Sequence, residues 1–393
     1  MKTVYIVLPP TPNELSIPFN TEFCLSFMKE QLGTVHPLFP MDCRLTCGDL
    51  IDSVPEADRL IVVRSGVMAM HVSLERLAEA CGNDNWTIVG PVMVNGASDQ
   101  ISPLPFSYAD VETFRELTEW LLTSRKGSVR HVETLSDEVF GCSPVVLKRF
   151  PANLPVTEIG SHAIWCELSK MVVEDSIAHS FSNYYRHPRM DLIDLIPDHV
   201  RSVLDVGCAE GAIGRYLKQH RTGIICVGIE PDPTAAGEAQ KDYDRVYVQP
   251  VENTVLPERF DCIVCGDILE HLIDPQNVLK MFHAFLHDQG ILVGSVPNIG
   301  HWSVIRELMK GRFQYVPAGI LCRDHLRFFT EDSLRNMLRN SGYIVEYLGY
   351  NQPIVSPEGR LFIEKLEKGF SAASASLTSE QFVFRSIKMP STS

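Results

Sequence analysis

Long apolar runs are missing from this chain of 393 residues. A helix that crosses a bilayer needs about 20 consecutive, predominantly apolar residues, and no stretch approaches that length. The first apolar run, residues 4–8, is too short for the core of a signal peptide and is more typical of a buried strand. We therefore expect a soluble, cytoplasmic protein without a membrane span.

Basic residues are scarce relative to acidic ones. The chain has 35 Lys and Arg against 49 Asp and Glu, a formal net charge of −14. General nucleic-acid binders normally present a basic surface, so we expect no nucleic-acid partner. Hydrophobic residues make up 45% of the chain and charged residues 21%, a composition that fills globular cores. At roughly 100–200 residues per domain, the length suggests two domains.

Cysteine does not follow the pattern of a disulfide framework. The 11 cysteines are an odd number and are spread through apolar segments, which suits reduced, buried thiols in a reducing compartment. Cys262 and Cys265 form a C-x-x-C pattern within a strand-like run. Because side chains alternate across a strand, the two thiols should lie on opposite faces, and we interpret them as core residues rather than metal ligands.

Three zones follow one another along the chain. Residues 1–150 should form a smaller α/β domain, with strands at 3–8, 59–63 and 86–89 and helices at 74–80 and 111–122. Residues 151–200 are predicted to be a connector whose last part, around Tyr184, Tyr185 and Arg186, is either a helix that closes over a ligand or a solvated amphipathic helix. Residues 201–393 alternate regularly between strands and helices, which predicts a mostly parallel sheet covered on both faces.

The most specific motif lies at residues 202–214, SVLDVGCAEGAIG. An apolar strand ends at Asp205 and enters a turn with Gly207 and Gly211, where the missing Cβ atoms let the backbone pass close to a ligand. The carboxylate of Asp205 suits a cationic group better than a phosphate. The turn lacks the full G-x-G-x-x-G of dinucleotide binders, which weakens that alternative.

Two further strands end in acids at the same predicted edge of the sheet. The strand at 223–229 is followed by Glu230, which is placed to accept hydrogen bonds from ribose hydroxyls. The strand at 260–266 is followed by Asp267. Ligands of open α/β sheets bind at this carboxyl edge, so we expect the site there.

Together these features resemble the class I S-adenosylmethionine-dependent methyltransferases over roughly residues 180–390, where 267–272, the "PN" loop after 290–296, 341–346 and 381–387 also follow the family pattern. The resemblance implies a seven-stranded Rossmann-like sheet whose last strand is antiparallel. Only Glu252 stands where the family often places an acid at the adenine amino group. The residues that the resemblance assigns to the cofactor are Asp205, Gly207, Cys208, Ala209, Gly211, Glu230, Pro231, Glu252, Asp267 and Ile268.

The segments at 297–303, 311–313 and 324–330 are more particular. They resemble bacterial methyltransferases encoded with, or fused to, glycosyltransferases of surface-polysaccharide synthesis. They are similar, more distantly, to ubiquinone-pathway O-methyltransferases. Both resemblances imply methyl transfer to an oxygen atom. His301 and Trp302 are candidates to line the acceptor pocket, although Trp302 is equally well explained as a core residue.

Methyl transfer to a sugar hydroxyl requires a base or a metal ion, because such a hydroxyl is a poor nucleophile. His271 and His325 are the candidate catalytic residues. Asp267, Glu270 and His271 would share one face of a helix, and with His325 they form a donor set suited to Mg²⁺, Mn²⁺ or Zn²⁺. This order is similar to that of the metal-dependent small-RNA 2′-O-methyltransferases, whose first acid is Glu. Alternatively, Glu270 caps or pairs structurally and His325 bonds a loop carbonyl.

The first 150 residues resemble a family 2 glycosyltransferase at 57–67, 73–77, 89–98 and 140–149. Active members of that family place one or two Asp after the strand at 61–63 to bind a metal ion and the sugar nucleotide. Here Arg64-Ser65-Gly66 follows, and no acid occurs between Leu60 and Leu74. We expect a degenerate module that grips a glycan or docks a partner enzyme, or else an unrelated small α/β domain.

The sequence predicts an S-adenosylmethionine-dependent O-methyltransferase that acts on a saccharide or glycan intermediate of surface-polysaccharide synthesis, with glycosyltransferases of the same pathway as partners. O-Methylation of a small phenol or quinone is the second hypothesis and would need a closed, apolar acceptor pocket. A non-catalytic scaffold in a polysaccharide assembly complex is the third. The combination of Asp205, Gly207, Gly211 and Glu230 argues against the scaffold.

Overall fold

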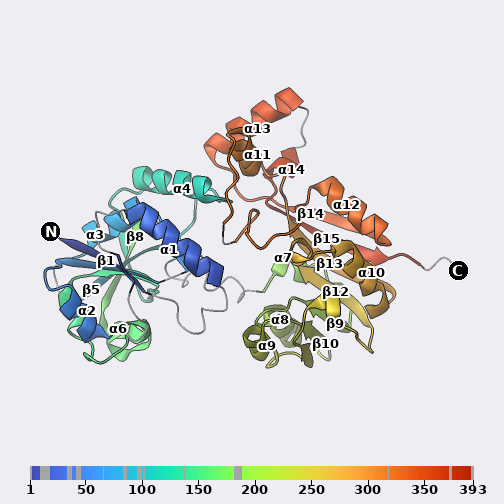
Figure 1. The fold of residues 1–393 in the computed structure, drawn as a ribbon, viewed down its shortest axis with the longest axis horizontal. Coiled ribbons are helices and arrows are strands. Elements are labelled where there is room, and N and C mark those ends of the chain that lie inside the picture. Colours follow the sequence, from blue (N-terminus) through green and yellow to red (C-terminus); the bar gives the residue numbers. More distant parts are fainter. Residues whose placement is uncertain are drawn as a thin grey trace. The chain divides into compact units, whose positions relative to one another are not determined.

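The computed structural model describes residues 2–8, 18–32, 38–40, 46–64, 66–82, 86–94, 100, 102–136, 138–180, 188–316, 318–370 and 374–390. The chain forms two compact units, Met1–Tyr184 and Tyr185–Ser393, each built around its own sheet (Figure 1). None of the helices in the described ranges has both the length and the apolar character that a membrane crossing requires. The predicted helix around Tyr184, Tyr185 and Arg186 lies outside the described residues.

The N-terminal unit contains an eight-stranded mixed sheet. Its strand order is β2-β1-β3-β7-β5-β8-β4, and β6 pairs with β8. The strands are β1 (Thr3–Leu8), β2 (Leu38–Pro40), β3 (Arg59–Arg64), β4 (Val67–Ala69), β5 (Thr87–Val94), β6 (Val129–Val132), β7 (Val139–Cys142) and β8 (Ser169–Ser180). The helices are α1 (Pro18–Leu32), α2 (Cys47–Ser53), α3 (His71–Ala80), α4 (Val111–Ser124), α5 (Pro144–Leu147) and α6 (Ala163–Glu167), with a 3₁₀ segment at Val156–Ser161.

Strand β8 lies where the sequence predicted a connector. It pairs in parallel with β5 and antiparallel with β4 and β6, so residues 169–180 belong to the N-terminal sheet. The strand was not predicted from the sequence because it contains charged residues. In the structure Glu174 forms ion pairs with Arg125 and Arg130, and Asp175 pairs with Arg76 inside the unit. Paired charges can be buried, whereas a sequence reading takes them as a sign of a solvated segment.

The C-terminal unit contains a seven-stranded sheet in the order β11-β10-β9-β12-β13-β15-β14. Within the described residues its strands pair in parallel, except that β15 is antiparallel to both β13 and β14. This confirms the predicted Rossmann-like sheet with an antiparallel last strand. The strands are β9 (Ser202–Val206), β10 (Ile225–Ile229), β11 (Arg245–Tyr247), β12 (Phe260–Gly266), β13 (Leu286–Pro297), β14 (Tyr343–Asn351) and β15 (Gln381–Lys388).

The helices of this unit either pack on the two faces of the sheet or, toward the C-terminus, pack with one another in a separate small cluster. They are α7 (Met190–Ile193), α8 (Ala212–His220), α9 (Pro233–Ala239), α10 (Pro275–Phe285), α11 (Trp302–Met309), α12 (Glu331–Asn340), α13 (Pro357–Phe370) and α14 (Ser374–Thr378), with 3₁₀ turns η3 (Val251–Asn253) and η4 (Leu269–His271). Cys262 packs in the hydrophobic cluster that includes residues of α8, and Cys265 packs in the cluster that includes α10 and α12. The two cysteines are therefore core residues on opposite faces, as predicted.

Asp205 is enclosed by α8 and the segment after α9. It is 3% exposed, and its carboxylate accepts a hydrogen bond from the hydroxyl of Tyr243. That hydroxyl in turn accepts the backbone N–H of Gly214 at 2.9 Å. The sequence led us to expect Asp205 to face a cationic group at the sheet edge. Strand alternation instead turns it toward α8, where it is a buried acceptor within the unit.

The burial of Asp205 predicts a pH dependence of stability. Burial, opposed by the Tyr243 hydrogen bond and reinforced by the charge of Glu230, raises the pKa of Asp205 from 3.8 to about 7. The folded state therefore holds a proton that the unfolded chain has released, and the free energy of unfolding falls as the pH rises from about 4 to about 7. An Asp205→Asn variant keeps an acceptor for Tyr243 but cannot ionise, so it should not show this fall, which amounts to at most about 4 kcal/mol.

Urea unfolding at about pH 4.5 and about pH 8, read by hydrogen exchange in β9 and α8, measures this difference. An Asp288→Asn variant is the matched control, because Asp288 is in the same unit and its side chain is 93% exposed. Equal pH dependence in wild type and Asp205→Asn would show that Asp205 is already ionised at neutral pH.

Candidate functional site

The candidate site lies at the carboxyl edge of the C-terminal sheet. The parallel strands β9, β10, β12 and β13 end there and are followed by Gly207, Glu230, Asp267 and Asn298, respectively. Two non-glycine residues in the loops of this edge have positive φ angles, Ala209 (45°) and Asp267 (56°). Such conformations cost free energy and concentrate at functional sites. Two of the three described non-glycine residues of this unit with positive φ angles thus lie at the edge where the sequence predicted the site.

Glu230 ties the loops after β9 and β10 together. Its Oε2 accepts the N–H of Ala209 at 3.0 Å, and its Oε1 accepts the N–H of Asp232 at 2.9 Å. Burial raises the pKa of Glu230, while these two hydrogen bonds lower it. A carboxylate has about four acceptor positions, so Glu230 retains positions for a ligand's hydroxyls. Sequence reasoning placed this residue at the ribose, and its geometry is compatible with that role.

Gly207 has a φ of +71°, and a Cβ there would lie 2.1 Å from Cδ1 of Ile268. The loops after β9 and β12 therefore pack against each other at this point. Cys208 is 5% exposed and contributes to the core around α8. Pro231 is exposed beside Glu230, and Glu252 is exposed in η3, after β11. The structure thus brings Gly207, Ile268 and Glu230 to the edge, whereas Cys208 supports the loop from the core.

Asp267 is not part of the cluster that the other predicted metal ligands form. Its carboxylate receives hydrogen bonds from Arg189 (2.6 Å), from the hydroxyl of Ser295 (2.8 Å) and from the amide of Gln381. The expected helical face is absent here, because Asp267 has a positive φ and only the 3₁₀ turn η4 follows it. The sequence did not predict that Arg189 binds Asp267, because Arg189 precedes β9 and no spacing rule connects the two residues.

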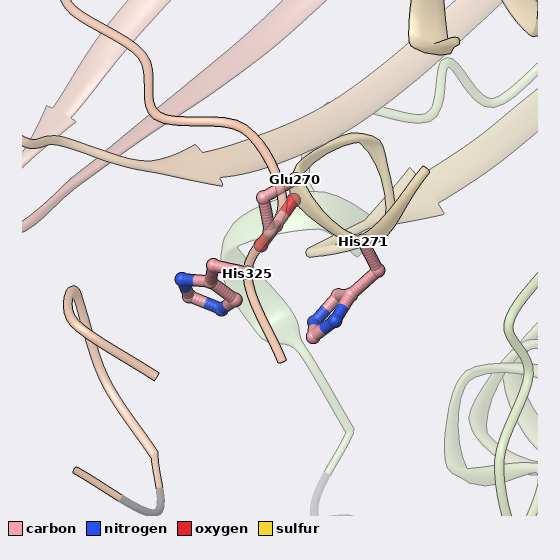
Figure 2. Close-up of side chains that lie close together, drawn as sticks. All are labelled: Glu270, His271 and His325. Atoms are coloured by element: carbon pink, nitrogen blue, oxygen red, sulfur yellow. The ribbon is translucent and has the colours of Figure 1, made fainter. Parts of the chain in front are cut away.

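Glu270, His271 and His325 do converge. Figure 2 shows the three side chains directed toward one another, and the atoms that each offers as a ligand all lie within 4.8 Å of one another. Glu270 is 1% exposed, and neither of its carboxylate oxygens has a hydrogen-bond partner. Burial, followed by the charge of Asp267, raises the pKa of Glu270 well above its usual range. A buried acid without partners is costly, which marks it as a functional candidate.

Backbone hydrogen bonds bring the two parts of this cluster together. The carbonyl of Glu270 accepts the N–H groups of Leu326 (2.8 Å) and Arg327 (3.0 Å), which fixes η4 against the segment that carries His325. His325 is also held by its backbone N–H, which donates to the carbonyl of Cys322 at 3.1 Å. The proximity of Glu270 and His325 is therefore built into the main chain.

Both histidines have a defined tautomer. Nδ1 of His271 lies 3.1 Å from the carbonyl of Asp324, and Nδ1 of His325 lies 3.0 Å from the carbonyl of Ile320. A carbonyl only accepts, so each Nδ1 carries the hydrogen and each Nε2 has a lone pair. Burial, and then the neighbouring His271, lowers the pKa of His325 to about 4, so this ring is neutral at neutral pH.

The donor set of the cluster fits a divalent transition-metal ion. One carboxylate and two imidazole nitrogens are ligands of Zn²⁺ and Mn²⁺, and metal-bound histidines commonly donate their other N–H to a carbonyl, as both do here. Neighbouring ligands of a tetrahedral ion with metal–ligand distances of about 2.1 Å lie roughly 3.4 Å apart, so side chains whose ligand atoms lie within 4.8 Å of one another would have to move closer by up to roughly 1.4 Å to close the set. Without an ion, the same arrangement presents two imidazole bases beside a buried acid.

His301 and Trp302 begin α11. Nδ1 of His301 lies 3.0 Å from the hydroxyl of Ser303, and its Nε2 is buried without a partner. Burial, and then the charge of Arg306, lowers the pKa of His301 to about 3. Trp302 is 2% exposed and packs in a small cluster with Ile363 of α13, while Arg306 lies over its ring. Trp302 is therefore a core residue, which was the alternative to its predicted place in the acceptor pocket.

In the N-terminal unit, β3 ends at Arg64, and Gly66 follows with a φ of +87°. Ser65 and the predicted segment at 95–98 lie outside the described residues. The glycosyltransferase-like character of this unit stays a prediction.

Comparison with known proteins points to one family for the C-terminal unit. Residues 178–348 match the family model of the methyltransferase domain. Ubiquinone biosynthesis O-methyltransferase of Azotobacter vinelandii is 24% identical over 165 residues, which cover 39% of this chain and 70% of that protein. Its counterpart from Coxiella burnetii is 26% identical over 151 residues, covering 36% of this chain and 63% of that protein. The chain thus spans roughly two thirds of the length of these relatives, and slightly less for the second.

Among solved structures, an S-adenosylmethionine-dependent methyltransferase from Archaeoglobus fulgidus is 18% identical and covers 53% of this chain and 98% of that chain, with a TM-score of 0.39. Magnesium protoporphyrin IX methyltransferase from Synechocystis, solved with S-adenosylhomocysteine, is 15% identical over 47% of this chain and 73% of that chain, with a TM-score of 0.33. The strand order and the family match agree: the C-terminal unit is a methyltransferase domain with the seven-stranded Rossmann-like sheet of the class I S-adenosylmethionine-dependent methyltransferases.

Proposed function

We propose that this protein methylates a hydroxyl oxygen of a saccharide or glycan intermediate of cell-surface polysaccharide synthesis. The observation that carries the proposal is the cluster of Glu270, His271 and His325 beside the cofactor edge. A sugar hydroxyl needs a base or a charge that lowers its pKa before it can attack a methyl group. The cluster offers both, and the segments around it carry the resemblance to polysaccharide-associated methyltransferases.

The loops after β9, β10 and β12 hold the cofactor in this proposal. S-adenosylmethionine supplies a methyl group on a sulfonium centre, ready for in-line displacement. Gly207 would let the backbone approach the cofactor closely, Glu230 would accept hydrogen bonds from its ribose, and Ile268 would contact it from the β12 side. Asp205 acts from the core by bonding Tyr243, which contacts the helix after the glycine turn.

His271 acts as the base at the acceptor. Its Nδ1 is committed to the carbonyl of Asp324, so Nε2 is the atom that takes the hydroxyl proton. His271 is exposed, whereas Glu270 and His325 are buried, which leaves it the accessible member of the cluster. If an ion is bound by Glu270 and the two Nε2 atoms, it supplies positive charge that lowers the pKa of a coordinated hydroxyl.

O-Methylation of a small phenol is the second candidate, because the curated relatives in the comparison are ubiquinone biosynthesis O-methyltransferases. A phenol ionises near pH 10 and needs less help from a base than a sugar hydroxyl does. Turnover of a catechol that exceeds turnover of saccharides would favour this candidate.

Gly207→Ala tests the cofactor loop. The added Cβ would displace Ile268, so we expect affinity for S-adenosylhomocysteine to fall at least tenfold in calorimetric titration. Gly223→Ala is the matched control: its φ of +75° imposes the same backbone strain, but nothing lies within 4 Å of the new Cβ. Equal affinity of both variants and wild type would remove Gly207 from the site.

His271→Ala tests the reacting cluster. Affinity for S-adenosylhomocysteine should stay near that of wild type, and methyl transfer should fall about 100-fold or more. His220→Ala, which removes an exposed histidine of α8, is the control. An unchanged rate in His271→Ala removes this residue from the mechanism.

Whether the cluster binds a metal ion is tested separately, by measuring Mn²⁺ binding. Electron paramagnetic resonance with Mn²⁺ should detect one bound ion per chain, and Glu270→Gln should abolish it, whereas Glu358→Gln on α13 should not. EDTA-resistant transfer together with undetectable Mn²⁺ binding would leave His271 as a base without a metal.

A further inference from the structure

A line of aromatic rings leads away from the reacting cluster. The ring of His271 lies 4.8 Å from that of His325 between centroids, and His325 lies 6.5 Å from Phe328. Phe328 lies 6.1 Å from Phe313, which lies 5.3 Å from Tyr315. Each ring thus contacts the next, from the proposed base to the surface.

The outer three rings are considerably exposed to solvent. Phe328, Phe313 and Tyr315 are 37%, 43% and 46% exposed. Leaving such rings in water forfeits the free energy that their burial would yield, and contiguous exposed apolar groups mark interaction sites. We therefore interpret the three exposed rings as a binding surface for a ligand that also reaches His271.

Main-chain contacts hold this surface in place. The N–H of Arg312 donates to the carbonyl of Glu307 at 2.9 Å, which fixes the chain just before Phe313. The N–H of Val316 donates to Leu321 at 3.0 Å, and that of Arg323 donates to Val316 at 3.1 Å. The rings therefore project from an ordered loop, and a ligand need not order it on binding.

The charge of the surrounding segment is opposite to that of the whole chain. Residues 310–328 contain Lys310, Arg312, Arg323 and Arg327 but only one acid, Asp324, in a chain of net charge −14. Lys310, Arg312 and the neighbouring Arg306 all pair with Glu307, so one carboxylate there serves three cations. An anionic ligand is favoured at this place, and a short one most of all, because the net negative charge of the chain as a whole disfavours a long polyanion.

We propose that the acceptor is a short acidic saccharide, whose sugar rings stack on Phe328, Phe313 and Tyr315 and whose carboxylate groups pair with the arginines of residues 310–328. This rests on the proposed function and names the substrate class of the same site. Sugar rings present apolar C–H faces that pack on aromatic rings, and arginine binds carboxylates with paired hydrogen bonds. A neutral saccharide would use the rings without the charges, and an isoprenoid tail would gain nothing from the arginines.

The test uses the full chain with S-adenosylhomocysteine bound and trigalacturonate as the probe, followed by ligand-observed NMR titration. Trigalacturonate should bind at least tenfold more tightly than maltotriose and than a trinucleotide of RNA. The Phe313→Ala/Tyr315→Ala double variant and Arg327→Gln should each weaken trigalacturonate binding at least tenfold. Phe370→Ala and Lys368→Gln, at the exposed end of α13, are the matched controls and should bind as wild type does.

All variants should bind S-adenosylhomocysteine with wild-type affinity, which shows that they are folded. Absent trigalacturonate binding, equal binding of maltotriose, tighter binding of RNA, or unaltered binding by the ring and arginine variants would each overturn the proposal. Transfer to hydroxyls is measured separately with radiolabelled S-adenosylmethionine. Ring-dependent trigalacturonate binding without any transfer would refute the proposed function and leave this binding surface standing.

Discussion

The candidate site of the C-terminal unit depends on a pair of hydrogen bonds to the backbone carbonyl of Glu270. Leu326 and Arg327 donate them, and they join two segments that are distant in the sequence. They hold the segment of His325 against Glu270 and so help to fix the line of rings that runs from His271 through His325. The chemistry is thus assembled by main-chain atoms, which any residue type supplies and no sequence motif reveals.

Buried acids in this protein are stabilised in three different ways. Glu174 and Asp175 form ion pairs with arginines. Asp205 accepts a hydrogen bond from a tyrosine hydroxyl, and Glu230 accepts hydrogen bonds from backbone N–H groups. Glu270 is handled differently, since neither of its oxygens has a partner. Each of the other four acids has at least one hydrogen-bonded oxygen, so a carboxylate with none carries more weight than the mere presence of an acid next to a histidine.

The sequence predicted the strands of the C-terminal sheet and their acidic ends, because buried parallel strands are continuous apolar runs and a change to a polar residue marks where each ends. It could not predict that Asp267 binds Arg189, or that Asp205 faces Tyr243, since both depend on which side of a strand or turn a side chain leaves. It also missed β8, whose charges are buried in pairs. In each case the deciding partner lies far away along the chain, where periodicity and spacing carry no information.

The contact between Gly207 and Ile268 has a consequence for how these two positions can vary. The isoleucine methyl occupies the space that a side chain at position 207 would need, so the two residues share one volume. A larger residue in the glycine turn would have to displace this methyl in addition to adopting a positive φ angle, and Ile268 stands directly before the turn with Glu270. The shape of the cofactor loop and the placement of the reacting acid are therefore mechanically coupled.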